Sequence, residues 1–261
     1  MATASPFSPE ALLHRAVIAL EGDRILSFLH NILTCDVETL NQGEVVYGAL
    51  LSPQGKIQHD LFVHNAGTSV LIDCDSGQCE ALISRLKLYR LRAKFVITPR
   101  DDVEVVVGGE GFADPRHAGL GARCIMPRGG AAAGETYETR RFALGIADSA
   151  EIGSGKLFPH EANFDQFGGI DFNKGCYIGQ EVVSRMQHRA TARSRILPLM
   201  FVDDQYTDEI RSNEMLLGEV LGRRGKQALA LLRLDRLAEL EVPLPFIVVK
   251  PDWAKFEVKL P

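Results

Sequence analysis

The chain has 261 residues, of which 46% are hydrophobic and 24% charged, and its formal net charge is −5 at pH 7. This length accommodates one or two domains with a substantial core, and the composition is that of a globular chain, neither disordered nor membrane-spanning. A mildly acidic balance argues against general nucleic-acid binding. The first apolar run, residues 16–20, is too short for a signal peptide or a membrane span. We therefore expect a cytoplasmic protein without a membrane partner.

The five cysteines do not indicate a structural site. None of them forms a Cys-x-x-Cys pair, so neither a disulfide framework nor a zinc site is predicted, and no metal ligands are assigned. Cys74 and Cys79 have one of the spacings found in iron–sulfur ferredoxins, but the other ligands of that pattern are absent. A loop is the better interpretation of that stretch.

The first half of the chain alternates strands and helices, an α+β order. Asp23 is expected to cap a helix whose apolar face runs from Ile25 to Leu33. Residues 52–55, Ser-Pro-Gln-Gly, predict a hairpin because Pro and Gly stand where a turn requires them. The other predicted elements are strands at 15–20, 45–51, 57–63, 69–72, 94–98 and 103–107, and a helix around 81–89.

The second half of the chain differs in composition and in its predicted elements. Residues 108–134 are rich in glycine and predict a surface loop region with short strands; Asp114 and Pro115 exclude a dinucleotide fingerprint after Gly109. Residues 141–146 are predicted to form a strand. Beyond residue 196, strands at 216–221, 227–234, 246–249 and 256–260 predict a small β-barrel. We expect an α+β domain over residues 1–195 and the barrel over 196–261.

The most distinctive stretch is Lys-Gly-Cys-Tyr-Ile-Gly-Gln-Glu at residues 174–181. From Ile178 an apolar residue recurs every fourth position, which predicts a helix. Cys176 would then lie at or just before the helix N-terminus, where the dipole and the nearby Lys174 favour a thiolate. The alternative is a purely structural turn, because a free cysteine is most often a small buried hydrophobe.

This octet resembles the signature of the YgfZ family of folate-binding proteins, which are relatives of the glycine-cleavage T-protein, an aminomethyltransferase. The similarity extends to residues 22–37, 49–60 and 141–163 and covers roughly residues 15–195. The resemblance implies a multidomain fold with a mixed α/β folate-binding part and a C-terminal barrel. It also implies tetrahydrofolate as the cofactor, and iron–sulfur cluster assembly proteins or client iron–sulfur enzymes as partners.

A folate binder requires an apolar slot, polar groups for the pterin edge and cations for the anionic tail. Candidate acids are Asp60, Glu161 and Asp165, and Tyr47 is a candidate stacking ring. An arginine-rich stretch follows the octet and suits an anionic tail. The full set of predicted ligand residues is Tyr47, Asp60, Glu161, Gln180, Glu181, Arg185, Arg189 and Arg193. Each of them also has an ordinary structural interpretation as a cap, a core residue or a solvated charge.

The T-protein pattern is incomplete here. Its paired aspartates are represented by Asp60 alone, and Ala143 stands where its Glu would fall. The leading hypothesis is therefore a tetrahydrofolate-binding protein of iron–sulfur cluster assembly or repair, with Cys176 as the functional thiol and Lys174 as its partner. A folate-dependent aminomethyltransferase and a non-catalytic interaction scaffold remain the alternatives, so whether the protein is an enzyme stays open.

Overall fold

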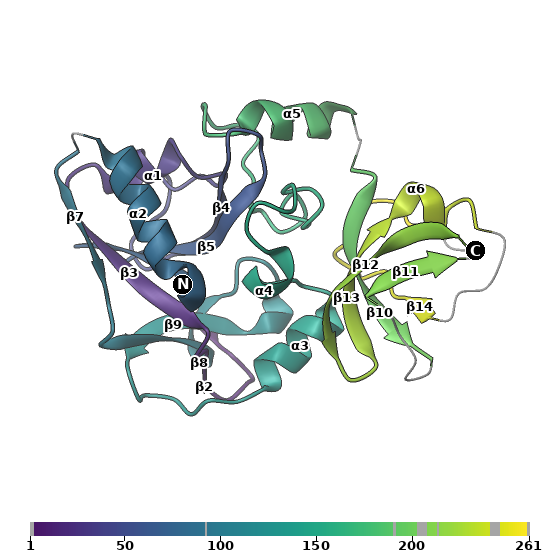
Figure 1. Cartoon of the computed structure of the whole chain (residues 1–261). Helices are drawn as coiled ribbons and strands as arrows, with labels where there is room; N and C mark the ends of the chain where they lie inside the picture. Colours follow the sequence, from purple (N-terminus) through teal and green to yellow (C-terminus); the bar gives the residue numbers. More distant parts are fainter. Residues whose placement is uncertain are drawn as a thin grey trace.

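The computed structural model describes residues 3–91, 93–189, 192–202, 208–212, 214–240 and 246–259. In this part of the chain the strands form three antiparallel sheets. Two sheets and most helices lie at one end of the molecule, and the third sheet lies at the other end (Figure 1). Helix α5 (Gln180–Arg189) runs along one side between the two ends.

The first sheet has the order β4-β5-β6-β3-β7. Helices α1 (Ile25–His30) and α2 (Cys79–Arg90) pack on it through a core that includes Leu29, Leu82 and Leu86. Its strands are β3 (Arg15–Gly22), β4 (Val45–Leu51), β5 (Ile57–Asn65), β6 (Val70–Asp75) and β7 (Phe95–Pro99). A single 3₁₀ turn, η1 (Ser76–Gln78), leads into α2.

The second sheet is built around the long strand β8 (Val103–Ala113). Short helices follow it, and residues 153–179 then form turns without a helix or strand. The sheet also contains β1 (Thr3–Ala4), β2 (Glu10–Ala11) and β9 (Ala122–Pro127), and the helices are η2 (Ala118–Leu120), α3 (Thr136–Leu144) and α4 (Ser149–Ile152).

The third sheet, with the order β11-β12-β13-β10-β14, is the C-terminal barrel. Alternate residues of β10 and β13 fill its interior, where Leu197, Leu199 and Leu232 are fully or almost fully buried. Its elements are β10 (Ser194–Phe201), β11 (Glu209–Ser212), β12 (Met215–Arg224), β13 (Gln227–Arg233), α6 (Leu234–Leu237) and β14 (Phe246–Val248). The predicted boundary after residue 195 stays a prediction.

One hydrophobic core joins the three sheets. It contains Tyr47 and Phe62 from the first sheet, Val105 from the second and Leu229 from the barrel, with Phe164 from the turns between them. Burying one contiguous core stabilises the sheets against one another, because the favourable free energy grows with the apolar area removed from water. The turns of residues 153–179 are therefore held against both ends of the molecule.

The predicted α+β class with a C-terminal barrel is confirmed, as are the hairpin at Ser52–Gly55 and the helix after the octet. Three local predictions are wrong. Residues 141–144 belong to helix α3, because Arg141 reaches back one helical turn to bind Glu138 and Gly145 ends the helix at φ 72°. The short strands expected within residues 108–134 are present, because β8 extends to Ala113 and β9 covers Ala122–Pro127.

The remaining two corrections concern element ends. Residues 256–259 form no strand, and the guanidinium of Arg195 lies over the Phe256 ring, 4.5 Å from its centroid. Asp23 does not cap α1: Arg24 occupies the N-cap position at φ 58°, and no side chain caps that end. A left-handed N-cap replaces the side-chain cap that sequence reasoning expects.

Candidate functional site

The signature loop, residues 169–179, is fastened to the chain that follows helix α1. Thr34 donates its hydroxyl to the carbonyl oxygen of Gly169 at 2.6 Å, and the Asp171 N–H donates to the Thr34 carbonyl at 2.9 Å. The same hydroxyl accepts from the Ala49 N–H of β4 at 2.9 Å. The loop is thereby joined through Thr34 to the first sheet.

Lys174 makes the strongest part of this attachment. Its ammonium donates to the carbonyl oxygens of His30 at 2.5 Å, Leu33 at 2.8 Å and Cys35 at 2.8 Å. His30 is the last residue of α1, and the carbonyls at a helix C-terminus lack partners within the helix. An ammonium has three donors, and all three are used here. Burial lowers the pKa of Lys174.

The sequence predicted that Lys174 interacts with the Cys176 thiol. In the structure its ammonium instead donates all three hydrogen bonds to main-chain carbonyls, so no donor is left for a thiolate. Lys174 therefore positions the loop, and its side chain also lies over the ring of Tyr177, with Nζ 5.3 Å from the centroid. Tyr177 is itself buried in the shared core.

The other end of the loop rests on the β4–β5 hairpin. Gly179 has φ 79°, and a Cβ there would lie 2.6 Å from the Ser52 carbonyl oxygen. Gly55 in turn lies against the side chain of Val182 on α5. Only glycine fits such a close approach in the left-handed region. Gly175 has neither constraint, because its φ is not positive and no atom lies near the position of a Cβ.

Cys176 lies on the exposed turn between these two attachments. Its side chain is exposed, whereas Cys35, Cys74 and Cys79 are buried. The amide of Gln180 donates to the Gly175 carbonyl at 3.3 Å and closes the turn. Cys176 lies before the N-terminus of α5 and not at it, because the chain first turns at Gly179 and the helix begins at Gln180.

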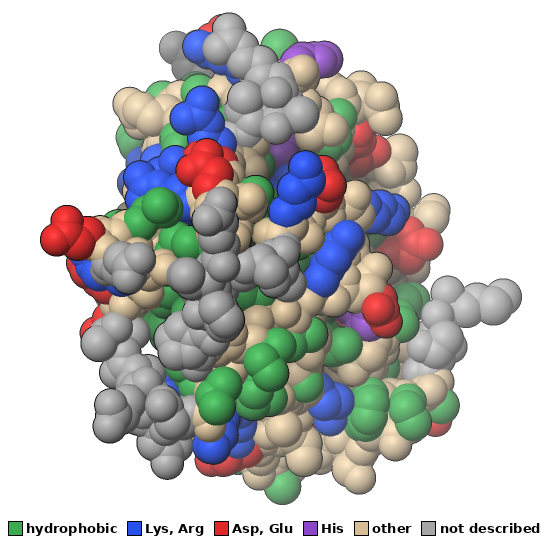
Figure 2. Space-filling view, turned by 90° about the vertical axis from the view of Figure 1, so that its right-hand side faces the viewer, with side chains coloured by type: hydrophobic (Ala, Val, Ile, Leu, Met, Phe, Trp, Pro, Cys, Tyr) green, Lys and Arg blue, Asp and Glu red, His purple; other side chains and the backbone are tan. Residues whose placement is uncertain are grey.

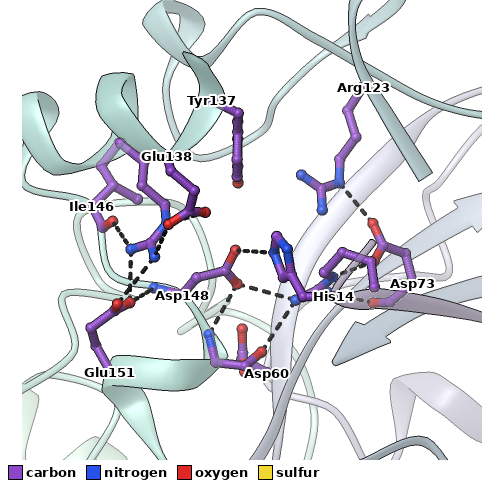
Figure 3. Close-up of polar contacts among 12 residues, drawn as sticks. His14, Asp60, Asp73, Arg123, Tyr137, Glu138, Ile146, Asp148 and Glu151 are labelled. Carbon is purple, nitrogen blue, oxygen red and sulfur yellow. Dashed lines mark hydrogen bonds and ion pairs between the residues drawn. The ribbon is translucent and has the colours of Figure 1, made fainter. Parts of the chain in front are cut away.

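A second cluster lies inside the first sheet and its neighbours (Figure 3). Asp73 binds two arginines, accepting from Arg15 Nε at 2.6 Å and from Arg123 Nε at 2.7 Å. Arg15 Nη1 also reaches Asp148 at 3.1 Å. These four side chains are almost fully buried. None of them was among the predicted site residues. For Arg15, Asp73 and Arg123 the only sequence signal is a charge within an otherwise apolar strand.

Asp60 lies at the edge of this cluster, beside Asp148 (Figure 3). Its Oδ1 accepts from the Ser149 hydroxyl at 2.6 Å, and its Oδ2 has no hydrogen-bond partner among the described residues. Burial, and then the charge of Asp148, raise the pKa of Asp60 to about 6. Asp60 therefore takes up a proton at a mildly acidic pH, unlike Asp73 and Asp148, whose arginine partners hold their pKa values low.

Tyr47 is close to Asp60 but enclosed by protein. Its ring stacks on Phe164 with 4.6 Å between centroids and packs against Phe62 at 4.9 Å. The guanidinium carbon of Arg116 lies 5.3 Å from the Tyr47 centroid. Burial raises the pKa of the Tyr47 hydroxyl well above its ordinary value. In this structure the ring packs in the core.

The other predicted ligand residues are dispersed. Glu161 accepts from the Phe158 N–H at 2.8 Å and stabilises a turn. Glu181 and Arg185 are exposed on α5. Arg193 is exposed beyond α5 and lines a groove against the barrel, which contains neither Tyr47 nor Asp60. The side chain of Arg189 lies outside the described residues.

The structure therefore brings Tyr47 and Asp60 together, and places Cys176 and Arg193 elsewhere. Asp165, the remaining candidate acid, binds Arg195 through both carboxylate oxygens, at 2.5 and 2.9 Å.

Among the residues that the structure describes, no three His, Cys, Asp or Glu side chains are grouped to hold a metal ion. In the same residues, no helix has the length and apolarity to cross a membrane.

The molecule has the fold of the glycine-cleavage aminomethyltransferase, with a C-terminal barrel. The crystal structure of glycine cleavage system aminomethyltransferase T from Bartonella henselae has a TM-score of 0.69 and 15% identity, over 87% of this chain and 78% of that one. Residues 193–256 match the family described as CAF17, C-terminal beta-barrel domain.

Sequence comparison identifies relatives named iron–sulfur cluster assembly factor IBA57. The chain is 33% identical over 223 residues to the IBA57 homolog of Pyricularia oryzae, covering 74% of this chain and 57% of that protein. It is 27% identical over 255 residues to human IBA57, covering 79% of this chain and 72% of that protein. The chain thus spans little more than half the length of the fungal relative. It is related to the IBA57 proteins.

The comparisons also correct the expected location. The relatives from Pyricularia oryzae, Neurospora crassa and Homo sapiens are all named as mitochondrial proteins. The expectation of a cytoplasmic protein is therefore wrong. It relied on the shortness of the apolar run at residues 16–20, which does not identify a compartment.

Proposed function

We propose that this protein acts in iron–sulfur cluster assembly and that Cys176 is its functional thiol. The observation that carries the proposal is an exposed cysteine on a turn that is fixed at both ends, by Lys174 on one side and Gly179 on the other. A purely structural cysteine has no need of exposure. The names of the IBA57 relatives supply the biological context.

A single exposed cysteine limits how this protein can bind an iron–sulfur cluster. Protein-bound iron–sulfur clusters are usually held by several cysteine thiolates. Cys176 offers a single exposed sulfur, so the remaining ligands of any cluster come from a partner protein. We therefore propose that the Cys176 sulfur binds transiently to an iron atom of a cluster, while a partner assembly protein or client enzyme supplies the other ligands.

The test is replacement of Cys176 in cells that lack the native protein. Cys176→Ser should fold normally, because losing one exposed sulfur removes no core contact. It should nevertheless fail to restore the activity of iron–sulfur enzymes. Cys124→Ser, at a half-buried position, is the matched control and should rescue fully. Full rescue by a well-folded Cys176→Ser protein would leave the signature loop as a structural turn.

Tetrahydrofolate is the ligand that we propose for the buried cluster around Asp60. The support is the Asp60 carboxylate, with one oxygen unpartnered in the described structure and a pKa raised to about 6. A buried acid of this kind suits the polar edge of a pterin, since buried polar groups require hydrogen-bond partners. Tyr47 is not part of this proposal, because its ring faces protein neighbours.

Calorimetric titration with tetrahydrofolate tests this assignment. Asp60→Asn keeps the shape and the contact with Ser149, but it exchanges a carboxylate oxygen for an amide donor, so affinity should fall by at least tenfold. Asp102→Asn, which changes an exposed aspartate paired with Arg100, should bind as the wild type does. Equal binding in all three proteins would remove Asp60 from the site, and no binding to the wild type would remove folate from the proposal.

A further inference from the structure

A groove of about 640 Å³ separates the end of α5 from the barrel. It is distinct from both clusters described above, because none of their residues lines it. Its volume is in the range of small-molecule sites, which often occur at junctions between structural units. We propose that this groove binds a small organic oxyanion, a carboxylate or phosphate attached to a flat apolar body.

The charges of the groove favour an anion. Its two carboxylates already have cationic neighbours: Asp235 binds Arg233 at 2.7 Å, and Glu257 lies 3.7 Å from Lys259. The guanidinium of Arg193, by contrast, has no partner among the described residues. Arg193 therefore leaves one uncompensated positive charge in the groove. Its planar fork matches the two oxygens of a carboxylate or phosphate.

Neutral donors reinforce this preference. Burial lowers the pKa of His160, so its imidazole is neutral at pH 7. His160 Nε2 lies 3.0 Å from the amide oxygen of Gln187, and a hydrogen bond to that oxygen requires the imidazole to donate. In the assigned orientation of the amide, the NH₂ group of Gln187 remains available to a ligand. The groove therefore offers an amide donor in addition to Arg193.

The side of the groove around Arg195 and Phe256, here called its floor, combines apolar side chains with a paired guanidinium. Arg195 is held by Asp165 through two hydrogen bonds and stacks on Phe256, so both side chains are fixed. Met186, Leu234 and Ala238 add apolar surface. On the face of the molecule that carries the barrel, Lys and Arg side chains lie among hydrophobic ones (Figure 2). An aromatic or other flat body can pack on the floor while its oxyanion meets Arg193.

Titration of the full chain with benzoate and phenyl phosphate, and with benzyl alcohol as a neutral probe, tests the proposal. Both anions should bind saturably, at least tenfold more tightly than benzyl alcohol, and their affinity should fall as salt is added. Arg193→Gln should weaken both at least tenfold. Arg185→Gln, at an exposed α5 position outside the groove, should change them less than twofold.

Three results would overturn the assignment. Equal binding of benzyl alcohol and benzoate would mean that the groove recognises only an apolar body. Unchanged affinity in Arg193→Gln, or no saturable binding of either anion to the wild type, would remove the oxyanion site. Thermal unfolding of each variant controls for folding, which should be unaffected because Arg193 is exposed and its guanidinium makes no hydrogen bond or ion pair with the described residues.

Discussion

Gly179 lies directly against Ser52, so that a Cβ at position 179 would come within 2.6 Å of the Ser52 carbonyl oxygen. This contact joins the signature octet to a hairpin about 130 residues earlier in the chain. It also distinguishes the two glycines of the octet, which the sequence alone cannot rank.

We predict that Gly179→Ala destabilises the protein by at least about 2 kcal/mol, because a left-handed backbone and a backbone collision both oppose the methyl group. Gly175→Ala should change the free energy of unfolding by less than about 0.5 kcal/mol, since its Cβ would meet open space. Urea denaturation of the two variants measures both values. Similar losses in the two variants would contradict this distinction.

Lys174→Met should destabilise the loop, because the apolar stem is kept while three carbonyl oxygens lose a cationic donor. The expected cost is about 2 to 4 kcal/mol. Hydrogen exchange should become faster at the end of α1 and in residues 169–179. Lys87→Met, at an exposed position on α2, is the control and should leave stability and exchange unchanged. Normal protection of the loop in Lys174→Met would show that Thr34 alone holds it.

The pH dependence of stability should reveal Asp60. Because its folded-state pKa of about 6 exceeds the usual 3.8, the folded protein binds a proton that the unfolded chain has released between these values. The contribution of Asp60 to stability is therefore greatest at low pH and is lost as pH rises through about 6.

Asp60→Asn has no such proton, so its stability relative to wild type should rise by about 2 to 3 kcal/mol between pH 4 and pH 7. Denaturation of both proteins at a series of pH values measures the difference. A difference that does not change with pH would mean that Asp60 keeps an ordinary acidity in the folded protein.

Thiol modification should be selective. A bulky maleimide should modify Cys176 first under native conditions, because the other cysteines are buried or half-buried. Mass spectrometry of peptides from the modified protein identifies the site. In Cys176→Ser the rapid phase should disappear, whereas in Cys124→Ser it should remain. A rapid phase that persists without Cys176 would show that another thiol is accessible.

The sequence predicts elements well where local signals act alone. The pattern Ser-Pro-Gln-Gly specifies a turn, and the period from Ile178 specifies helix α5. Prediction from the sequence fails where contacts with residues distant in the chain determine the local structure. Arg141 lies in a helix stabilised by a pair with Glu151, and Phe256 packs under Arg195 where a strand was expected. Neither partner can be identified from neighbouring residues.

The candidate site shows the same limit. The octet identifies Cys176, because its composition is local and unusual. The buried cluster was missed apart from Asp60, because Arg15, Asp73 and Arg123 become neighbours only when three strands assemble. A charged residue within an apolar strand is the sole local signal, and it does not predict which residue will be its ion-pair partner. The role of Lys174 could not be predicted either. Its acceptors are backbone carbonyl groups of residues 30–35, far from it in the sequence, and backbone carbonyls leave no signal in a sequence.

The attachment of Lys174 to His30 spans 144 positions, and this separation has a kinetic consequence. Contacts between residues so far apart form late, because the entropy of closing a long loop must first be offset by other structure. The turn bearing Cys176 acquires its shape only after both α1 and the turns before α5 are in place. An incompletely folded chain therefore cannot display the thiol in its native form, so partners that read this turn would engage only chains that have finished folding.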